Sequence, residues 1–406
     1  MTTLITNCRL IDGVSQEVRP SASVAIEKGR ITKVTSDGTG IDRNGKQVID
    51  CNGGWLLPGL WDVHIHLQFP DISPPDDAAV RTIRYGINAM EGLREAGVTA
   101  IRTAGTDNWI DVAWKNVFAA GELQGPRIFA GGYFLTTTAG HGHGQPFALQ
   151  CDGPQEFLRA VRQQIENGVD HIKLDLSGGV MGPPWDRQWH NFLLEEELEA
   201  VFRLCCLRDM KVMSHATNAQ AVKDAVRLGT WSVEHGYEMD EDCIQMMMDK
   251  GVFYIPTLGV THLTPAQATT HWEKEFMKQW SEVIPGEFLA RADDAARVHR
   301  KWFQTALSAG VKMAIGSDLG PLKEATLMEM GCWVRAGATP MQTIKAATAV
   351  AAEVCGVEHD LGTVEEGKIA DLILVKDDPL KDVNNLRTLQ MVFKDGKLIV
   401  DKRASS

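Results

Sequence analysis

The feature that most constrains the fold is an alternation of apolar, strand-like runs with helical patterns through the middle of the chain. Each run ends in polar or glycine residues, and most are followed by a segment of helical periodicity, such as GPQEFLRAVRQQIENG, LLEEELEAVFRLCCLRD or NAQAVKDAVRLG. The runs are GLWDVHIHL, GVTAIRTAG, PRIFAGGYFLT, VDHIKLDLSGG, KVMSHATN, WSVEHGYE, GVFYIPTLG and GVKMAIGSD. Eight such units over roughly 250 residues predict an α/β fold, a (β/α)8 TIM barrel that spans residues 59–360.

The two ends of the chain have a different sequence pattern. Residues 1–58 contain short runs with period-two patterning, separated by Asp-Gly, Lys-Gly and Gly-Gly turns, and residues 361–406 repeat this pattern. We therefore expect one small β-sandwich domain assembled from both termini.

Charge and composition exclude several classes of protein. The net charge of −12 argues against nucleic acid as a partner, because phosphate binding needs a basic face. The sequence has neither a run of about 18 apolar residues nor a basic-then-apolar leader, so we expect no membrane association. Its eight cysteines are scattered without a C-x-x-C pair, which favours a reducing compartment. These features predict a cytoplasmic protein that acts on a small-molecule substrate.

Six polar residues lie in or at the ends of predicted strands, where barrel enzymes carry their chemistry. His64 and His66 share one side of the first strand, since residues i and i+2 of a strand point the same way. The others are Lys173, His215, His235 and Asp318. All six side chains can bind a metal ion or move a proton.

Each residue alone has an ordinary structural interpretation. A histidine at a strand end can simply be hydrogen-bonded, Lys173 can extend its charged end to solvent, and Asp318 can cap a turn. Independent accidents would not all fall at strand ends in this order, so the joint pattern favours a shared site.

The chain resembles the amidohydrolase superfamily, and within it the branch of imidazolonepropionase-like proteins, Xaa-Pro dipeptidases and ochratoxin-type amidohydrolases. The resemblance covers nearly the whole chain. The segments that carry it are LPGLWDVHIHL, GVTAIRTAG, AGHGHG, HIKLDLSGGV, SHATNAQAV, VEHGYEMD, GVFYIPTLG, GSDLG and GTVEEGKIADLILV.

This resemblance implies a centre of two divalent metal ions, expected to be zinc. His64, His66 and Asp318 match the ligands of one ion, and His215 with His235 those of the other. Lys173 matches the lysine that becomes N6-carboxylysine and bridges both ions. In that scheme a hydroxide shared by the metals attacks the substrate carbonyl, and Asp318 moves the proton.

The glycine-rich segment AGHGHG holds two further histidines. His141 matches a residue that hydrogen-bonds the substrate carbonyl in relatives, which implies a role in stabilising the oxyanion; a plain loop histidine is the alternative. His143 stands where relatives tend to have an acidic residue, so its role is open.

The resemblance implies a substrate with an amide-type C–N bond, either an Xaa-Pro-like dipeptide or an N-acyl amino acid. One departure argues for a different or neutral substrate: Thr217 replaces a tyrosine that holds the substrate carboxylate in the dipeptidases. Tyr237 or Arg102 could compensate, although structural duty is an equal alternative.

Two other functions stay open. Hydrolysis of small carbamates, ureas or anilides would suit an aromatic pocket around Trp185 and Trp189. A non-catalytic barrel scaffold is the other, although all six expected ligand positions are filled. Homo-oligomers are common in such families, and the sequence leaves the oligomeric state open.

Overall fold

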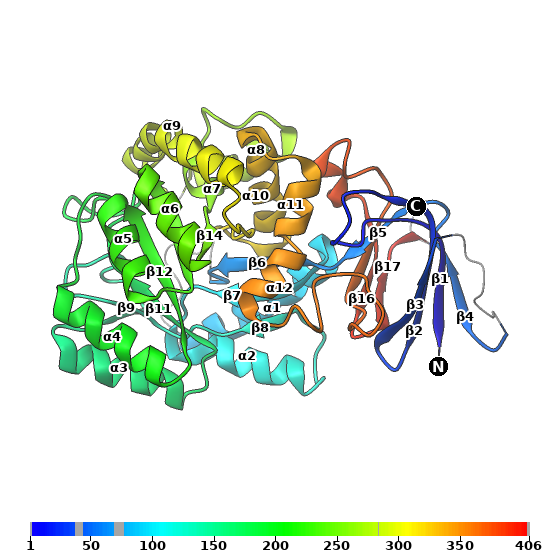
Figure 1. Cartoon of the computed structure of the whole chain (residues 1–406), viewed down its shortest axis with the longest axis horizontal. Helices are drawn as coiled ribbons and strands as arrows, with labels where there is room; N and C mark the ends of the chain where they lie inside the picture. Colours follow the sequence, from blue (N-terminus) through cyan, green and yellow to red (C-terminus); the bar gives the residue numbers. More distant parts are fainter. Residues whose placement is uncertain (1, 37–43, 69–76, 283, 404–406) are drawn as a thin grey trace.

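The computed structural model describes residues 2–36, 44–68, 77–282 and 284–403. Parallel strands surrounded by helices form one part of the molecule, and a strand-rich part built from both chain ends lies beside it (Figure 1).

Two parallel sheets occupy the middle of the chain. One has the strand order β6-β7-β8, and the other β10-β9-β11-β12-β13-β14. The strands are β6 (Leu60–Ile65), β7 (Val98–Thr103), β8 (Arg127–Phe129), β9 (Phe134–Thr136), β10 (Ala148–Gln150), β11 (His171–Asp175), β12 (Lys211–Asn218), β13 (Ser232–Glu238) and β14 (Phe253–Ile255). Seven of the eight predicted runs contain strands, and PRIFAGGYFLT contains two. The predicted parallel α/β architecture is confirmed.

The eighth predicted run, GVKMAIGSD, differs from the expectation because it contains no regular strand. It still connects two strands through hydrogen bonds: Ala314 N donates to Tyr254 O of β14 at 3.2 Å, and Val63 N of β6 donates to Ile315 O at 2.8 Å. Met313 also forms an isolated parallel bridge with Tyr254. These contacts support a ring of eight strands, which stays an expectation.

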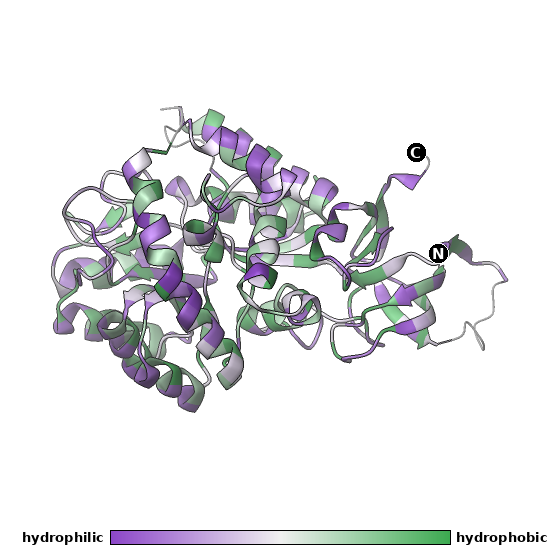
Figure 2. Cartoon of the chain, turned by 90° about the horizontal axis from the view of Figure 1, so that it is seen from above, coloured by the Kyte–Doolittle hydropathy of each residue, from purple (hydrophilic) through white to green (hydrophobic). Residues whose placement is uncertain are grey.

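Helices cover the parallel sheets, and their apolar faces turn inward (Figure 2). Three were predicted by the patterns quoted above and are confirmed as α3, α4 and α5. The helices are α1 (Ala78–Ala96), α2 (Ile110–Ala119), α3 (Pro154–Glu166), α4 (Glu195–Leu207), α5 (Ala219–Leu228), α6 (Glu241–Lys250), α7 (Leu258–His262), α8 (His271–Trp280), α9 (Gly286–Ala309), α10 (Leu322–Ala336), α11 (Pro340–Ala346) and α12 (Ala349–Cys355), with short 3-10 turns at η1 (Asp107–Trp109) and η2 (Val383–Arg387).

The chain ends meet in one eight-stranded mixed sheet. Its order is β17-β16-β15-β5-β1-β2-β3, and β4 pairs with β1. The strands are β1 (Thr3–Leu10), β2 (Arg19–Glu27), β3 (Arg30–Thr35), β4 (Gln47–Asp50), β5 (Trp55–Pro58), β15 (Leu372–Val375), β16 (Leu389–Lys394) and β17 (Lys397–Asp401). Since β5 pairs with both β1 and β15, the two termini share this sheet, whereas the predicted sandwich of two sheets and the predicted domain boundaries stay expectations.

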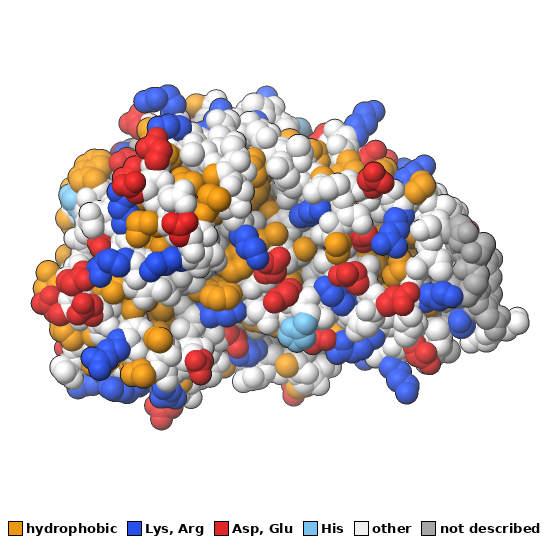
Figure 3. Space-filling view, viewed as in Figure 1, with side chains coloured by type: hydrophobic (Ala, Val, Ile, Leu, Met, Phe, Trp, Pro, Cys, Tyr) orange, Lys and Arg blue, Asp and Glu red, His pale blue; other side chains and the backbone are white. Residues whose placement is uncertain are grey.

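Basic and acidic side chains are interspersed over the face shown in Figure 3. Within the described ranges, none of the helices has both the length and the apolarity needed to cross a bilayer.

Candidate metal centre

The site begins at the end of β6, where two histidines share one acidic partner. His64 and His66 are buried, and the Nε2 atom of each lies 3.4 Å from Oδ1 of Asp318. Their other ring nitrogens are held from behind: His64 Nδ1 lies 2.7 Å from Glu234 Oε2, and His66 Nδ1 lies 3.2 Å from the carbonyl oxygen of Gly105. Both imidazoles therefore direct Nε2 toward one carboxylate. Their position on the same side of the chain agrees with the spacing of the pair.

Asp318 and His235 meet this pair in an unusual backbone conformation. Both residues have positive φ angles, +51° for Asp318 and +74° for His235, which residues other than glycine rarely adopt. The backbone of Asp318 is fixed because its N–H donates to His64 O at 2.8 Å. His235 lies in the middle of β13, with Nδ1 4.0 Å from Asp318 Oδ2 and 2.7 Å from Thr257 Oγ1. Such left-handed residues are concentrated at functional sites in proteins.

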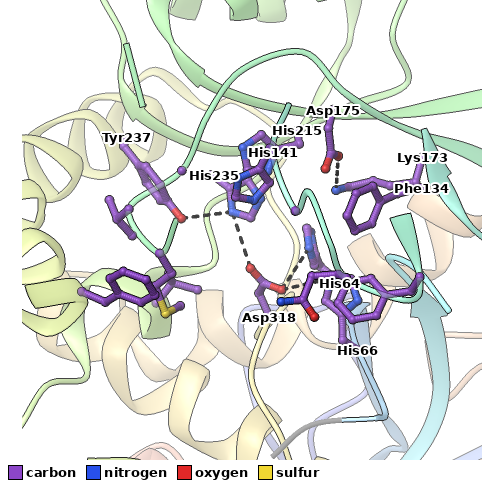
Figure 4. A pocket seen from close by; sticks show the side chains of 18 of the residues that line it. His64, His66, Phe134, His141, Lys173, Asp175, His215, His235, Tyr237 and Asp318 are labelled. Carbon is purple, nitrogen blue, oxygen red and sulfur yellow. Dashed lines mark hydrogen bonds and ion pairs between the residues drawn. The ribbon is translucent and has the colours of Figure 1, made fainter. Parts of the chain in front are cut away.

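His215 and Lys173 come from the neighbouring strands β12 and β11. The His215 ring lies 4.4 Å from the His235 ring, measured between centroids, and 4.2 Å from the His141 ring, on which it stacks. Lys173 is buried, and its Nζ donates to Asp175 Oδ1 at 2.7 Å beside the Phe134 ring. All six residues predicted from the strand ends thus face one another (Figure 4).

These six residues form one side of a cavity of about 180 Å³, which we call the polar wall: His64, His66, Lys173, His215, His235 and Asp318. A second side, the apolar wall, comes from α7 to α9 and the segment between α8 and α9: Val260, Trp280, Ile284, Pro285 and Phe288. His141, Tyr237, Phe134, Phe147 and Met181 also line this space.

The residues of the polar wall fit a divalent metal ion. Among the described residues, the buried Nε2 atom of His64 has no hydrogen-bond partner, although Asp318 Oδ1 lies 3.4 Å away. Imidazole nitrogens and carboxylate oxygens are the donors that zinc prefers. Two groups have ligand atoms within 4.8 Å of one another: His64, His235 and Asp318, and also His141, Asp175 and His215.

This grouping differs in part from the one implied by the resemblance. His64 and Asp318 belong together in both, but His235, assigned by the resemblance to the other ion, joins them here. His215 is grouped instead with Asp175 and His141.

Burial sets the charge of the site. It lowers the pKa of His66 to about 3, and it holds the pKa values of His215 and His235 well below the ordinary value. Burial also opposes the charge of Asp318, yet His64 and His66 hold the pKa of its carboxyl well below the usual range. Near neutral pH these three histidines therefore offer imidazole lone pairs beside an ionised carboxylate, whereas Asp318 and Glu234 raise the pKa of His64 against the effect of burial.

Arg102 has the structural environment that the sequence left open as the alternative to a substrate contact. It is buried behind the polar wall, where Nε donates to Val63 O at 2.7 Å, Nη1 to Ser232 Oγ at 2.9 Å and Nη2 to Glu234 Oε1 at 2.9 Å. It does not line the cavity. Its carboxylate partner is Glu234 of the same chain, since a buried guanidinium needs a fixed counter-charge.

The other expected substrate contacts divide into two groups. Tyr237 lines the cavity, with its hydroxyl 3.5 Å from His235 Nδ1. Thr217 does not, because its hydroxyl is buried within hydrogen-bonding distance of the carbonyl oxygens of Gly178, at 2.7 Å, and Gln188, at 2.8 Å. It holds the loop after β11 instead.

Trp185, Trp189 and His143 also lie away from the cavity lining. The tryptophans are 49% and 59% exposed and are not among the described residues that line this cavity. His143 Nδ1 accepts a hydrogen bond from Ala139 N at 3.3 Å within its own loop. Both indoles are largely exposed to solvent, and the predicted aromatic pocket around them stays an expectation.

Sequence reasoning missed the carboxylates that hold the site in place. Glu234 supports His64, Asp175 pairs with Lys173, Asp186 pairs with His141, and Asp62 accepts hydrogen bonds from His64 N and Ser317 N. The available signal was an acidic residue inside or directly after an apolar run, as in WDVHIH, IKLD and SVEHG. Such residues are rarely buried unless they are paired.

Comparison with known proteins agrees with this geometry. A model described as the amidohydrolase family matches residues 55–399. Ochratoxinase from Aspergillus niger is 30% identical over 379 residues, which cover 84% of this chain and 75% of that protein. A solved Xaa-Pro dipeptidase with methionine bound in its active site is 28% identical, with a TM-score of 0.85 over 98% of this chain and 100% of that one.

A second solved structure, a prolidase in complex with N-methylphosphonate-L-proline, is 27% identical, with a TM-score of 0.87 over 99% of this chain and 100% of that one. The family match covers well over half of the chain, and the resemblance seen in the sequence is confirmed. The protein is a hydrolase that acts on C–N bonds, and it belongs to the amidohydrolase family.

Proposed function

We propose that this protein is a metal-dependent amidohydrolase that cleaves the amide bond of a dipeptide, Xaa-Pro-like, or of an N-acyl amino acid. The observation that carries the proposal is the convergence of the six residues of the polar wall on one cavity. Six metal-binding or proton-moving side chains around one space are costly to bury without a shared function.

The polar wall would hold two divalent ions, expected to be zinc. His64, His66 and Asp318 would bind one, His215 and His235 the other, and Lys173 would bridge them as N6-carboxylysine. Ions held there polarise a carbonyl and lower the pKa of water. The pairing of Lys173 with Asp175 is compatible with this role, because its Nζ already lies at the wall of the cavity.

The remaining steps belong to side chains of the chain itself. In this proposal Asp318 takes a proton from the attacking water and returns it to the departing amine. His141 borders the same cavity, and a hydrogen bond from its ring to the substrate oxygen would stabilise the charge that develops there.

The substrate class is supported by the relatives and by the apolar wall. Solved structures that cover 98% or more of this chain are named as a Xaa-Pro dipeptidase and a prolidase. Trp280, Ile284 and Phe288 offer an apolar surface to a side chain such as proline or a larger hydrophobic residue.

A second candidate is hydrolysis of neutral carbamates, ureas or anilides. It is favoured by the lining of the cavity, where Lys173 is the one lysine or arginine among the described residues. A free substrate carboxylate would then lack a dedicated cationic partner, whereas a neutral substrate needs none.

A substrate panel tests both candidates. Purified protein would be assayed with Xaa-Pro dipeptides, N-acyl amino acids, aryl carbamates and phenylureas, before and after removal of metal with a chelator. We expect cleavage of dipeptides or N-acyl amino acids, loss of activity on chelation, and recovery with Zn²⁺. Cleavage of carbamates or ureas alone would favour the second candidate. Less than one divalent ion per chain, together with no cleavage, would point to a scaffold.

A further inference from the structure

The loop after β9 places His141 between the cavity and a buried carboxylate. One face of its ring stacks on His215, with centroids 4.2 Å apart and planes inclined by 29°. On the other side, His141 Nδ1 lies 2.8 Å from Asp186 Oδ2. The ring is therefore held both in its plane and at one nitrogen.

Asp186 lies in the loop between β11 and α4, and it is only 1% exposed. Its two oxygens have different partners, since Oδ2 faces His141 and Oδ1 accepts from the backbone N–H of Gly179 at 2.9 Å. A buried carboxylate is costly unless such bonds compensate it. The Gly179 bond places the carboxylate, and the carboxylate in turn places the imidazole.

The loop sequence SGGVMGPPWD leaves room for this pair. A Cβ atom on Gly182 would lie 2.2 Å from Asp186 Oδ2, and one on Gly179 would lie 2.5 Å from His141 Cε1. Any larger residue at either position would displace the carboxylate or the ring. These glycines are thus explained by the space that Asp186 and His141 occupy.

We propose that Asp186 is a positioning residue for His141, a role that rests on the proposed function of His141 at the substrate oxygen. A carboxylate only accepts hydrogen bonds, so Nδ1 of His141 must carry the hydrogen between them. This bond resists a flip of the ring and leaves Nε2 as the nitrogen available to the substrate oxygen. To donate there, Nε2 must carry a second hydrogen, so the ring acts as the imidazolium beside the Asp186 carboxylate. Asp186 acts on the substrate through the orientation of this ring and does not touch the substrate itself.

The proposal predicts a graded loss of activity. Asp186→Ala removes the acceptor and frees the ring, so kcat should fall about 10- to 100-fold while KM changes less than about threefold. Asp186→Asn keeps the shape and one acceptor oxygen, and should recover part of that loss. Asp152→Ala is the matched control, since Asp152 accepts from Thr138 at the start of the same loop without touching His141.

Two further measurements separate positioning from a structural role. The double variant H141A/D186A should be no slower than H141A alone, because Asp186 has nothing left to orient. The metal content and the melting temperature of D186A should match those of the wild type. Nitrogen-edited NMR spectra would detect the proton on His141 Nδ1, and the absence of its signal in H141A would assign it. We expect this proton to be protected from exchange in the wild type. We expect its signal to be lost in D186A.

Wild-type kcat in D186A, additive losses in the double variant, loss of bound metal, or an unprotected Nδ1 proton in the wild type would each overturn the proposal. If no substrate of the panel is cleaved, the proposed function fails, and the NMR comparison of wild type with D186A still decides whether Asp186 orients the ring.

Discussion

The two walls of the cavity are built in different ways. In the polar wall, side chains from β6, β11, β12 and β13 are each held by a second residue, such as Glu234 behind His64 or Asp175 beside Lys173. The apolar wall comes from the long connection between β14 and residue 313, through α7, α8 and α9, and it presents packing surfaces without charge.

This difference suggests a division of labour. Most groups that must meet at fixed distances lie on strands or directly after one, where hydrogen bonds to neighbours leave little freedom, and Asp318 is held by the hydrogen bond from its N–H to His64 O. Groups that select a substrate lie on a connection that can change without moving the sheet. The walls should therefore respond differently to substitution: changes in the polar wall should affect kcat and metal binding, and changes in the apolar wall should affect KM.

The largest effect is expected for Asp318→Asn in the polar wall. It removes the charge that His64 and His66 share and the group proposed to move the proton, so kcat should fall about 100- to 10,000-fold. Steady-state kinetics on the best substrate of the panel would measure this. The control is Asp224→Asn on the exposed side of α5. A variant that keeps more than about a tenth of wild-type kcat would remove Asp318 from the mechanism.

A smaller effect is expected one layer behind the polar wall. Glu234→Gln removes the negative charge shared by His64 and Arg102, and the affinity for Zn²⁺ should fall about 10- to 100-fold. Competition with a chromophoric chelator would measure it. Glu238→Gln on the same strand is the matched control, since Glu238 contacts Gln188 rather than a histidine. Unchanged zinc affinity would mean that His64 needs no support from Glu234.

In the apolar wall, Phe288→Ala should change binding rather than catalysis. Losing a buried part of a phenyl ring should raise KM for substrates with large apolar groups about tenfold and leave kcat within about threefold. The comparison is Phe118→Ala, a partly buried ring on α2 that packs on Trp114. A fall in kcat with constant KM would contradict the separation of the two walls.

The smallest effect is expected for Trp189→Ala. The indole is 59% exposed and outside both walls, so kcat and KM should change less than about twofold and the free energy of unfolding by less than about 0.5 kcal/mol. Kinetics and urea denaturation would test this, with Trp272→Ala on α8, a tryptophan that is 45% exposed, as the control. A marked rise in KM would restore Trp189 to the substrate site.

Much of the polar wall could be predicted because its residues follow a rule of position. Parallel strands place their carboxyl ends at one edge, so His64, His215 and His235 had to come close once the alternation of strands and helices was recognised. The parallel sheets and the helices α3, α4 and α5 followed from periodicity for the same reason.

Contacts that depend on loops could not be predicted in this way. Trp185 and Asp186 are neighbours in the sequence, yet the first is half-exposed and the second is buried against His141. Arg102 looked like a partner for a substrate carboxylate until the structure paired it with Glu234, which is 132 residues away. A local sequence pattern does not show which of many distant, oppositely charged residues a charged side chain will pair with.

The sequence by itself determined the class of fold and the side chains that gather at the strand ends, because strand periodicity and chain direction act over a few residues at a time. Only the tertiary structure decided which carboxylate supports which histidine, and which aromatic residues reach the cavity. Those choices depend on burial and on distances between segments far apart in the chain, where the cost of an unpaired buried charge selects one arrangement.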